Sequence, residues 1–271
     1  MSVRKEASGR RSVQVEVEVP GTPDQVWQAI ATGPGVTAWF VPTTMQLENG
    51  VPVAVTSNFG PGMESTAKIT SWSPLQSFSA ASEGWNGSPP MATEWTVEAR
   101  AGGKCVVRVI HSLFASTDDW DNQLESTEHG WPSFFRILQI YLANFRGMTG
   151  TSVQVMSMTS ESEVHAWEKM TNGLGLAAAK IGQQWTAPAG APSLSGIVEP
   201  LGPDQHSQNV LVRLDQPTPG IASFCAYICG GPVFAMVLLY LYGDGANAAA
   251  TQYEPQWQQW MKDRFPPAAT P

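Results

Sequence analysis

The first half of the chain carries short stretches in which hydrophobic and polar residues alternate. Four valines within residues 13–19 are each separated by a polar residue, which is typical of a half-buried β-strand. Further short apolar stretches follow residue 42, with turn signals at Asn49-Gly50, Gly60-Pro61-Gly62 and Gly102-Gly103. The pattern predicts an antiparallel meander with strands near residues 43–47, 51–57, 64–72, 78–81, 92–99 and 104–114.

Helical periodicity replaces this alternation at three points. Thr22 is expected to cap a short helix that has Pro23 at its first position. Gly33-Pro34-Gly35 is expected to end that helix. Trp39-Phe40 follows at once and indicates a second short helix that presses aromatic side chains onto the sheet.

The longest helical pattern runs from Asp118 to Phe145. Past Pro132, large apolar residues recur at helical spacing, whereas polar residues such as Arg136 and Gln139 fill the other side. Each such side chain contributes about 1.5–3 kcal/mol when it is buried, so this face needs a broad apolar partner. We therefore predict an α+β fold in which the long helix lies across the concave face of a curved antiparallel sheet.

The opening of the chain recurs 140 residues later. Residues 12–15 (SVQV) match residues 152–155, Trp27 matches Trp167, and Gly33 and Gly35 match Gly173 and Gly175. Matches in register across strand, helix and helix break indicate a tandem duplication. We predict a disordered tail at 1–11, a first domain at 12–147, a linker at 147–151 and a second, divergent domain at 152–266.

The second domain is predicted to have strands near residues 195–199, 210–215, 221–229 and 233–242, and a helix near 251–265 with Trp257, Trp260 and Met261 as its apolar stripe. Because this helix is shorter and lacks the Gly-Trp-Pro segment of the first, we expect a reduced or closed cavity. The chain is expected to be a homodimer or an intramolecular pseudo-dimer of its two domains, which a light-scattering mass tests.

Charge and composition narrow the range of partners. The formal net charge of −8 disfavours nucleic acid, because phosphate binding needs a concentrated basic surface. No apolar segment follows the basic residues near the amino terminus, so we expect no export signal and a cytoplasmic location. Residues 221–242 are apolar for most of their length, but Gly230-Gly231-Pro232 interrupts them, which favours two buried strands over a membrane span.

Metal and cofactor signals are weak. Cys105, Cys225 and Cys229 form no CxxC pair, and they are expected to be buried small apolar residues. No phosphate loop or dinucleotide fingerprint is present, so we expect no cofactor. The acidic residues before the long helix invite a metal-site interpretation, but a solvated helix start capped by Ser116 or Thr117 is favoured. The cluster consists of Asp118, Asp119, Asp121, Glu125 and Glu128, alongside His129.

Strand parity selects the one polar candidate for chemistry. Arg108 is expected to face water, so Cys105, Val107, Val109, His111 and Leu113 point toward the helix. His111 is then a general-base candidate or a ligand-orienting group, the alternative being a core histidine with a backbone partner. We predict a ligand-binding pocket lined by Trp39, Phe40, Phe59, Met63, Ile69, Trp95, His111, Phe135, Leu138 and Tyr141.

Three segments carry a family resemblance. Residues 27–33 (WQAIATG), 39–42 (WFVP) and 130–135 (GWPSFF), with 141–145 (YLANF), resemble the bacterial branch of the Hsp90-ATPase-activator-like proteins, which belong to the START/Bet v1 (SRPBCC) superfamily. The resemblance covers about residues 12–147. It implies a helix-grip fold with a cavity between sheet and terminal helix, but one fold serves many functions.

Three functions are compatible with these patterns and with the resemblance. The first is binding of a hydrophobic or amphipathic small molecule in the cavity of the first domain, with His111 or Tyr141 orienting it. The second is a cyclase- or hydrolase-type enzyme with His111 as base. The third is an Hsp90-type chaperone regulator, which is suggested by the family's name alone.

Overall fold

The computed structural model describes residues 3–60, 62–83, 89–200, 208–228 and 232–266. The chain divides into two compact units, Met1–Gly147 and Met148–Pro271, and the boundary falls within the predicted linker. Both units contain an antiparallel sheet and helices, so the predicted α+β class is confirmed.

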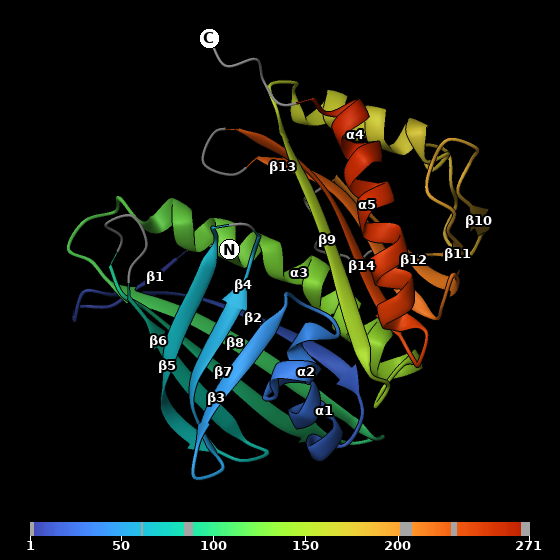
Figure 1. Ribbon diagram of the computed structural model, residues 1–271. Coiled ribbons are helices and arrows are strands. Elements are labelled where there is room, and N and C mark those ends of the chain that lie inside the picture. Colours follow the sequence, from blue (N-terminus) through green and yellow to red (C-terminus); the bar gives the residue numbers. More distant parts are fainter. Residues whose placement is uncertain (1–2, 61, 84–88, 201–207, 229–231, 267–271) are drawn as a thin grey trace. The chain divides into compact units, whose positions relative to one another are not determined.

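The first unit holds an eight-stranded antiparallel sheet in the order β1-β2-β8-β7-β6-β5-β4-β3 (Figure 1). β2, the strand that opens the repeated segment, pairs with β8, the last strand of the unit. The strands from β3 to β8 each pair with the next one along the chain. The elements are β1 (Arg4–Lys5), β2 (Arg10–Pro20), α1 (Pro23–Ile30), α2 (Gly33–Thr37), β3 (Thr43–Glu48), β4 (Val51–Asn58), β5 (Glu64–Ser73), β6 (Ser77–Ser82), β7 (Met91–Arg100), β8 (Lys104–Phe114) and α3 (Asp121–Asn144).

Local sequence signals account for most of these boundaries. Thr22 and Gln25 form the capping box that starts α1, with Pro23 in the first turn. Asn49-Gly50 and Gly102-Gly103 have positive φ angles and close hairpins, as predicted. α1 ends at Ile30, before the predicted break at Gly33-Pro34-Gly35. The second short helix begins at these residues, with Thr32 as its cap, and not at Trp39-Phe40 as expected. Part of the turn signal at 60–62 lies outside the described residues.

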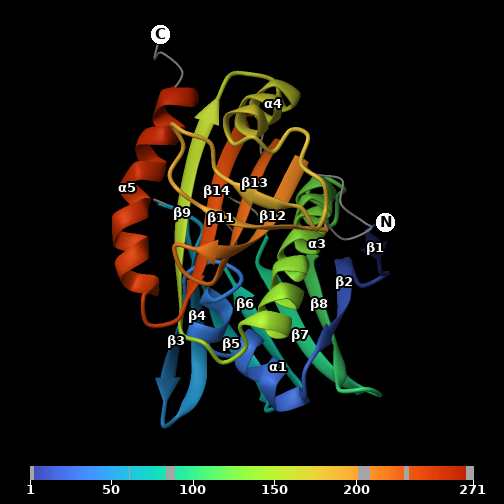
Figure 2. The same cartoon turned by 90° about the vertical axis from the view of Figure 1, so that its right-hand side faces the viewer.

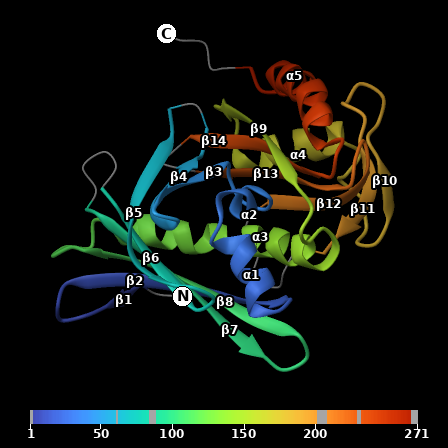
Figure 3. The same cartoon turned by 60° about the horizontal axis from the view of Figure 1, so that its bottom comes forward.

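The inward face of β8 follows the predicted parity. Cys105, Val107 and Val109 are fully buried, whereas Arg108 forms an ion pair with Glu16 on the other face. α3 runs along the inside of the curved sheet, and its closest strand is β2 (Figure 3). The helix-grip arrangement of a long terminal helix inside an antiparallel sheet is therefore confirmed for this unit.

The amino-terminal segment corrects one expectation. The sequence predicts a disordered tail at residues 1–11, but β1 and the start of β2 lie in this segment and pair with each other in the sheet. Val3 is buried, and Arg11 binds Asp118 at 2.7 Å and Asp121 at 2.6 Å. Basic residues near the amino terminus thus hold this segment in place through ion pairs with acidic residues before and at the start of α3.

The acidic residues before α3 are paired with these cations. Lys5 also binds Asp118 and Asp121, and together with Arg11 it lowers the pKa of both carboxyl groups. The expected caps, Ser116 and Thr117, are wrong, because α3 begins after Trp120 with no side-chain cap bond. Among the residues that the structure describes, no cluster of His, Cys, Asp and Glu is suited to a metal ion.

The second unit repeats the topology of the first with fewer strands. Its sheet has the order β10-β11-β12-β13-β14-β9, so the first strand again pairs with the last (Figure 2). This shared topology supports the tandem duplication predicted from the sequence. The elements are β9 (Gly150–Thr159), α4 (Glu163–Gly173), β10 (Gln184–Thr186), β11 (Ser195–Glu199), β12 (Gln208–Gln216), β13 (Gly220–Ile228), β14 (Val233–Tyr242) and α5 (Ala246–Arg264).

One face of this second sheet packs against α4 and α5. Trp257, Trp260 and Met261 of α5 are buried there beside Phe224 and Trp185, so the predicted apolar stripe is confirmed. The helix begins at Ala246, five residues before the predicted start, because alanines extend its first turns.

The apolar residues 221–242 form β13 and β14, as predicted. No helix in the described part of the chain has the length and hydropathy needed to cross a bilayer. Cys105 and Cys225 are buried as expected, whereas Cys229, Gly230 and Gly231 lie outside the described residues.

The close approach of α1 and α2 generates a test. A Cβ atom on Gly35 would lie 1.9 Å from the carbonyl oxygen of Gln28, which is backbone and cannot move aside. We expect Gly35→Ala to lower the free energy of unfolding by about 3 kcal/mol or more, measured by urea denaturation.

Gly130 provides the matched control. It lies inside α3 with open space where its Cβ would be, so Gly130→Ala should raise the free energy of unfolding by up to about 1 kcal/mol. Equal effects of the two substitutions would contradict the close packing of α1 on α2.

Candidate functional site

A cluster of aromatic side chains fills the space between the first sheet and α3. Trp39 and Phe40 follow α2, Trp95 lies on β7, and Phe135 lies on α3. Trp39 lies 6.3 Å from Trp95 and 6.5 Å from Phe135 between ring centroids, and Trp95 lies 6.4 Å from Phe135. Aromatic contacts at these distances add to the free energy of apolar burial. We call this set, together with Trp131 and Phe134, the aromatic cluster.

Trp131 is the centre of the aromatic cluster. Its ring contacts Trp95 at 5.1 Å, Phe135 at 5.2 Å and Phe40 at 5.2 Å between centroids. The predicted pocket omits Trp131, which entered the prediction only as part of a family segment. Its spacing of four residues from Phe135, which is one helical turn, is the signal that places both on the same face.

The aromatic contacts continue beyond the predicted pocket. Phe78 stacks on Trp95 at 6.2 Å, and Trp27 of α1 contacts Phe78 at 5.9 Å and Trp72 at 5.1 Å. Trp27 and Phe78 are buried, so these additional aromatic contacts are explained by packing of the hydrophobic core.

The end of the aromatic cluster that Phe40 and Phe134 form is less buried. Phe40 and Phe134 meet edge to face at 4.6 Å, and both side chains are only partly buried. Phe59 joins Phe40 at 5.9 Å. Phe40 and Phe134 also contact Trp131, at 5.2 Å and 6.4 Å between ring centroids.

The structure brings most of the predicted pocket residues together. Trp39, Phe40, Trp95, His111 and Phe135 lie in or against the aromatic cluster, Phe59 touches it through Phe40, and Leu138 is fully buried one turn after Phe134. Three others are placed differently. Met63 and Ile69 are only partly buried, and Tyr141 hydrogen-bonds the backbone of Gly147 at the carboxyl end of α3.

His111 is 7% exposed and both of its ring nitrogens have partners. The indole Nε1–H of Trp131 donates to Nε2 of His111 at 2.8 Å, and Nδ1 lies 3.0 Å from Oγ1 of Thr93. Because Nε2 accepts, the neutral ring carries its proton on Nδ1, which donates to Thr93. Burial lowers the pKa of His111 from 6.5 to about 4. The imidazole is therefore neutral and fixed in one tautomer at neutral pH.

The acidic residues near the start of α3 were expected to be solvated, but Glu128 is buried. It lies one turn before Trp131, and Leu124, one turn earlier, packs with Val13 and Leu113 of the sheet. Helical spacing thus directs Glu128 toward the sheet. Its side chain is 7% exposed, and Oε2 has no hydrogen-bond partner among the described residues.

The site is a packed aromatic interior with few polar groups. A buried carboxylate oxygen without a donor costs about 1–3 kcal/mol or more, so the site is incomplete with respect to hydrogen bonding. His111 and Thr93 satisfy each other, so in the described interior of the first unit Glu128 is the buried acid that remains to be satisfied.

Comparison with known proteins supports the architecture. Residues 20–143 match the family model described as "Activator of Hsp90 ATPase homolog 1-like protein". The match spans the elements from the end of β2 to the last turn of α3, and it includes every residue of the aromatic cluster. A search of curated proteins gave no match.

Solved structures that match this chain cover either about half of it or nearly all of it. CalU16 from Micromonospora echinospora has a TM-score of 0.41 and 16% identity, over 53% of this chain and 83% of that chain. DynU16, a protein in the dynemicin biosynthetic locus, has a TM-score of 0.42 and 16% identity, over 93% and 96%. The di-domain ARO/CYC BexL from the BE-7585A biosynthetic pathway has a TM-score of 0.43 and 14% identity, over 96% and 100%. Similarities of this size carry no conclusion about function.

The environment of His111 predicts a pH dependence of stability. Its pKa is lowered in the folded state, so between pH 6.5 and about 4 the unfolded chain binds more protons than the folded one. The free energy of unfolding should fall by about 3 kcal/mol as the pH is lowered through this range. Urea denaturation of wild type and His111→Gln at several pH values measures this contribution as the difference between their slopes.

His165 is the matched control for this measurement. It is exposed, and its backbone N–H donates to the hydroxyl oxygen of the cap Ser162. His165→Gln therefore removes an exposed imidazole where His111→Gln removes a buried one, and the two variants are compared at the same pH values. A His111→Gln variant whose stability has the same pH dependence as the wild type would show that His111 titrates as it does in the unfolded chain.

Proposed function

The first unit belongs to the family of Activator of Hsp90 ATPase homolog 1-like proteins, and from that premise we propose that it binds a small, flat, amphipathic molecule between its sheet and α3. The observation that carries the proposal is the unpartnered, buried carboxylate oxygen of Glu128 on the same helix as the aromatic cluster. The ligand is an aromatic molecule that carries a hydrogen-bond donor.

Affinity comes from the rings. Trp131, Trp95 and Phe135 present flat apolar surfaces, and a planar ligand that inserts among them gains stacking and apolar burial. Phe40 and Phe134 form the partly exposed layer over Trp131, so rotation of these two side chains is the movement that admits the ligand. This movement needs no change in the backbone of the sheet.

Orientation comes from Glu128. A carboxylate oxygen accepts hydrogen bonds, so Glu128 selects a ligand that carries a hydroxyl or an ammonium donor. A hydrogen bond to a charged group contributes about 1.5–3 kcal/mol, which is a factor of ten or more in affinity. His111 contributes indirectly, because it holds the indole of Trp131 in place.

The geometry favours binding over catalysis. A cyclase or hydrolase step with His111 as base requires a ring nitrogen that can take a proton from a substrate. In this structure Trp131 and Thr93 occupy both nitrogens, and the pKa of about 4 makes the ring a weak base at neutral pH. Loss of turnover in His111→Ala with ligand binding retained would reverse this ranking.

The remaining expectations stay predictions. An Hsp90-type regulatory role is tested by retrieval of an Hsp90 protein with an altered ATPase rate. The cytoplasmic location and self-association also rest on the sequence alone, and fractionation and light scattering test them.

Paired probes test the proposed ligand chemistry. We expect 2-naphthol and 1-naphthylmethylamine to raise the melting temperature and to quench tryptophan fluorescence, because each has a flat body and a donor. 2-Methoxynaphthalene, which has the same ring system without a donor, should bind at least about tenfold more weakly. If none of the three raises the melting temperature or quenches fluorescence, the proposal is wrong.

Substitutions of Glu128 assign the effect to one residue. Glu128→Leu should remove the preference for the donor-bearing probes and should also stabilise the free protein by about 1–3 kcal/mol, because it removes an unsatisfied buried group. Glu125→Gln is the matched control, since Glu125 lies on the same helix but is less buried. A preference for 2-naphthol that survives in Glu128→Leu would exclude Glu128 as the anchor.

A further inference from the structure

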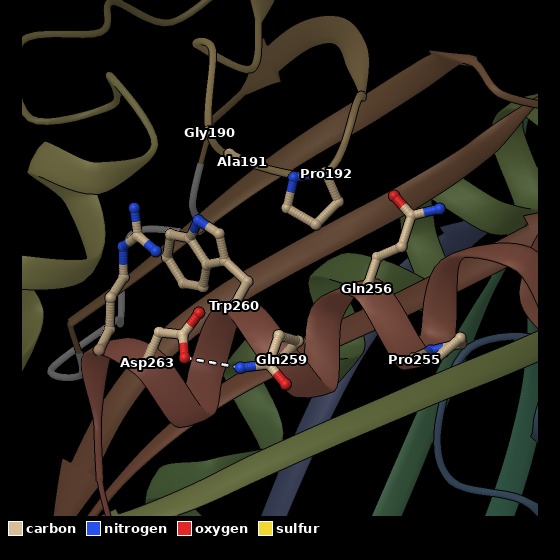
Figure 4. Close-up of a pocket in the computed structure, with 9 residues that line it drawn as sticks. Gly190, Ala191, Pro192, Pro255, Gln256, Gln259, Trp260 and Asp263 are labelled. Carbon is tan, nitrogen blue, oxygen red and sulfur yellow. Dashed lines mark hydrogen bonds between the residues drawn. The ribbon is translucent and has the colours of Figure 1, made fainter.

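A groove with a volume of about 530 Å³ lies on the second unit, between α5 and the loop that joins β10 to β11. Pro192 and its neighbours form one wall, and Pro255, Gln256, Trp260 and Asp263 of α5 form the other (Figure 4). Trp260 projects from the helix toward the loop. The volume is in the range of small-molecule sites.

Arg264 gives this groove a cation with unused hydrogen-bonding capacity. Its guanidinium carbon lies 4.0 Å from the ring centroid of Trp260, in a stacked cation–π contact. Among the residues that the structure describes, no hydrogen bond or ion pair to the guanidinium is present. A stacked guanidinium uses its face for the ring and keeps the N–H groups at its edge for a planar acceptor such as a carboxylate.

The position of Arg264 is held by its packing against α4. A Cβ atom on Gly173 would lie 2.8 Å from Nε of Arg264 and 3.2 Å from the ring of Trp260, so the absence of a side chain at Gly173 makes room for the stack. Burial also lowers the pKa of Arg264, in keeping with a guanidinium that is drawn out of water. The cation is thus preorganised rather than free to extend into solvent.

Asp263 is the opposing charge in the groove. Its Oδ1 accepts a hydrogen bond from Nε2 of Gln259 at 2.6 Å, so this carboxylate is engaged along the helix and not with Arg264 (Figure 4). Its charge weakens the binding of an anion without removing the donors that the anion would use. The indole N–H of Trp260 also lacks an acceptor among the described residues.

We propose that this groove binds a small organic carboxylate, with Arg264 pairing with the carboxylate and Pro192, Pro255 and Trp260 contacting its apolar body. The geometry assigns Arg264 as the binding residue and Asp263 as the residue that limits affinity. The site is independent of the function proposed for the first unit, since it involves another domain and a ligand of opposite polarity to the one that Glu128 selects.

Calorimetric titration of the full chain with 1-naphthoate tests the proposal, with 1-naphthamide as the neutral probe of the same shape. We expect naphthoate to bind at least about tenfold more tightly than the amide. Arg264→Gln should abolish this preference, and Arg264→Lys should leave it reduced, because lysine keeps the charge but loses the planar fork. Asp263→Asn should tighten naphthoate binding severalfold.

Lys262→Gln is the matched control, since Lys262 is an exposed cation on the same helix that does not line the groove. It should leave naphthoate binding unchanged. Equal binding of naphthoate and naphthamide, or equal losses in Lys262→Gln and Arg264→Gln, would overturn the proposal. Glu128→Leu should leave naphthoate binding intact, so failure of the site in the first unit and failure of this one are distinguishable.

Discussion

The hydrogen bond from the Trp131 indole to Nε2 of His111 determines how α3 lies on the first sheet. Helix packing by apolar contact alone tolerates small rotations and shifts, whereas a buried donor and acceptor must meet or both lose their partners. Thr93 accepts a hydrogen bond from the other ring nitrogen of His111. Two hydrogen bonds therefore connect β7, β8 and α3 through an apolar interior. The aromatic cluster and the inward direction of Glu128 both follow from this helix orientation.

The two units show what a shared topology leaves free to change. In both, the first strand pairs with the last and a terminal helix follows, yet the polar groups on the two terminal helices differ. α3 carries a buried carboxylate and an indole that is bonded to a histidine, whereas α5 carries Trp260 beneath an arginine. Duplication therefore preserves the strand pairings, and the chemistry is set by a few positions on each helix.

Helices, strands and turns that depend on local sequence patterns can be predicted from the sequence. Structure that depends on contacts between residues far apart in the chain cannot. Alternation, the Thr22 cap and the hairpin glycines are local signals, so the strands, α1 and the turns were placed within a few residues. The order of residues 3–11 depends on ion pairs between Arg11 and acids more than a hundred positions away, which no local pattern reveals. Six of the ten predicted pocket residues lie in or against the aromatic cluster, because strand and helix parity is periodic. The predicted pocket lacks Trp131 and Glu128, because residue type does not show that their positions on the helix direct them inward.

The distinction between a core and a binding site depends on satisfaction of polar groups. A tightly packed aromatic interior is fully explained by stability, since every ring buried contributes favourably and His111 has partners for both nitrogens. Glu128 is not explained in this way, because leucine at the same position would bury more apolar surface and leave no carboxylate unsatisfied. A residue that lowers stability where a more stable alternative exists is expected where function requires it. The proposal of a ligand for the first unit therefore rests on an inward-facing acid without which the fold alone would be more stable.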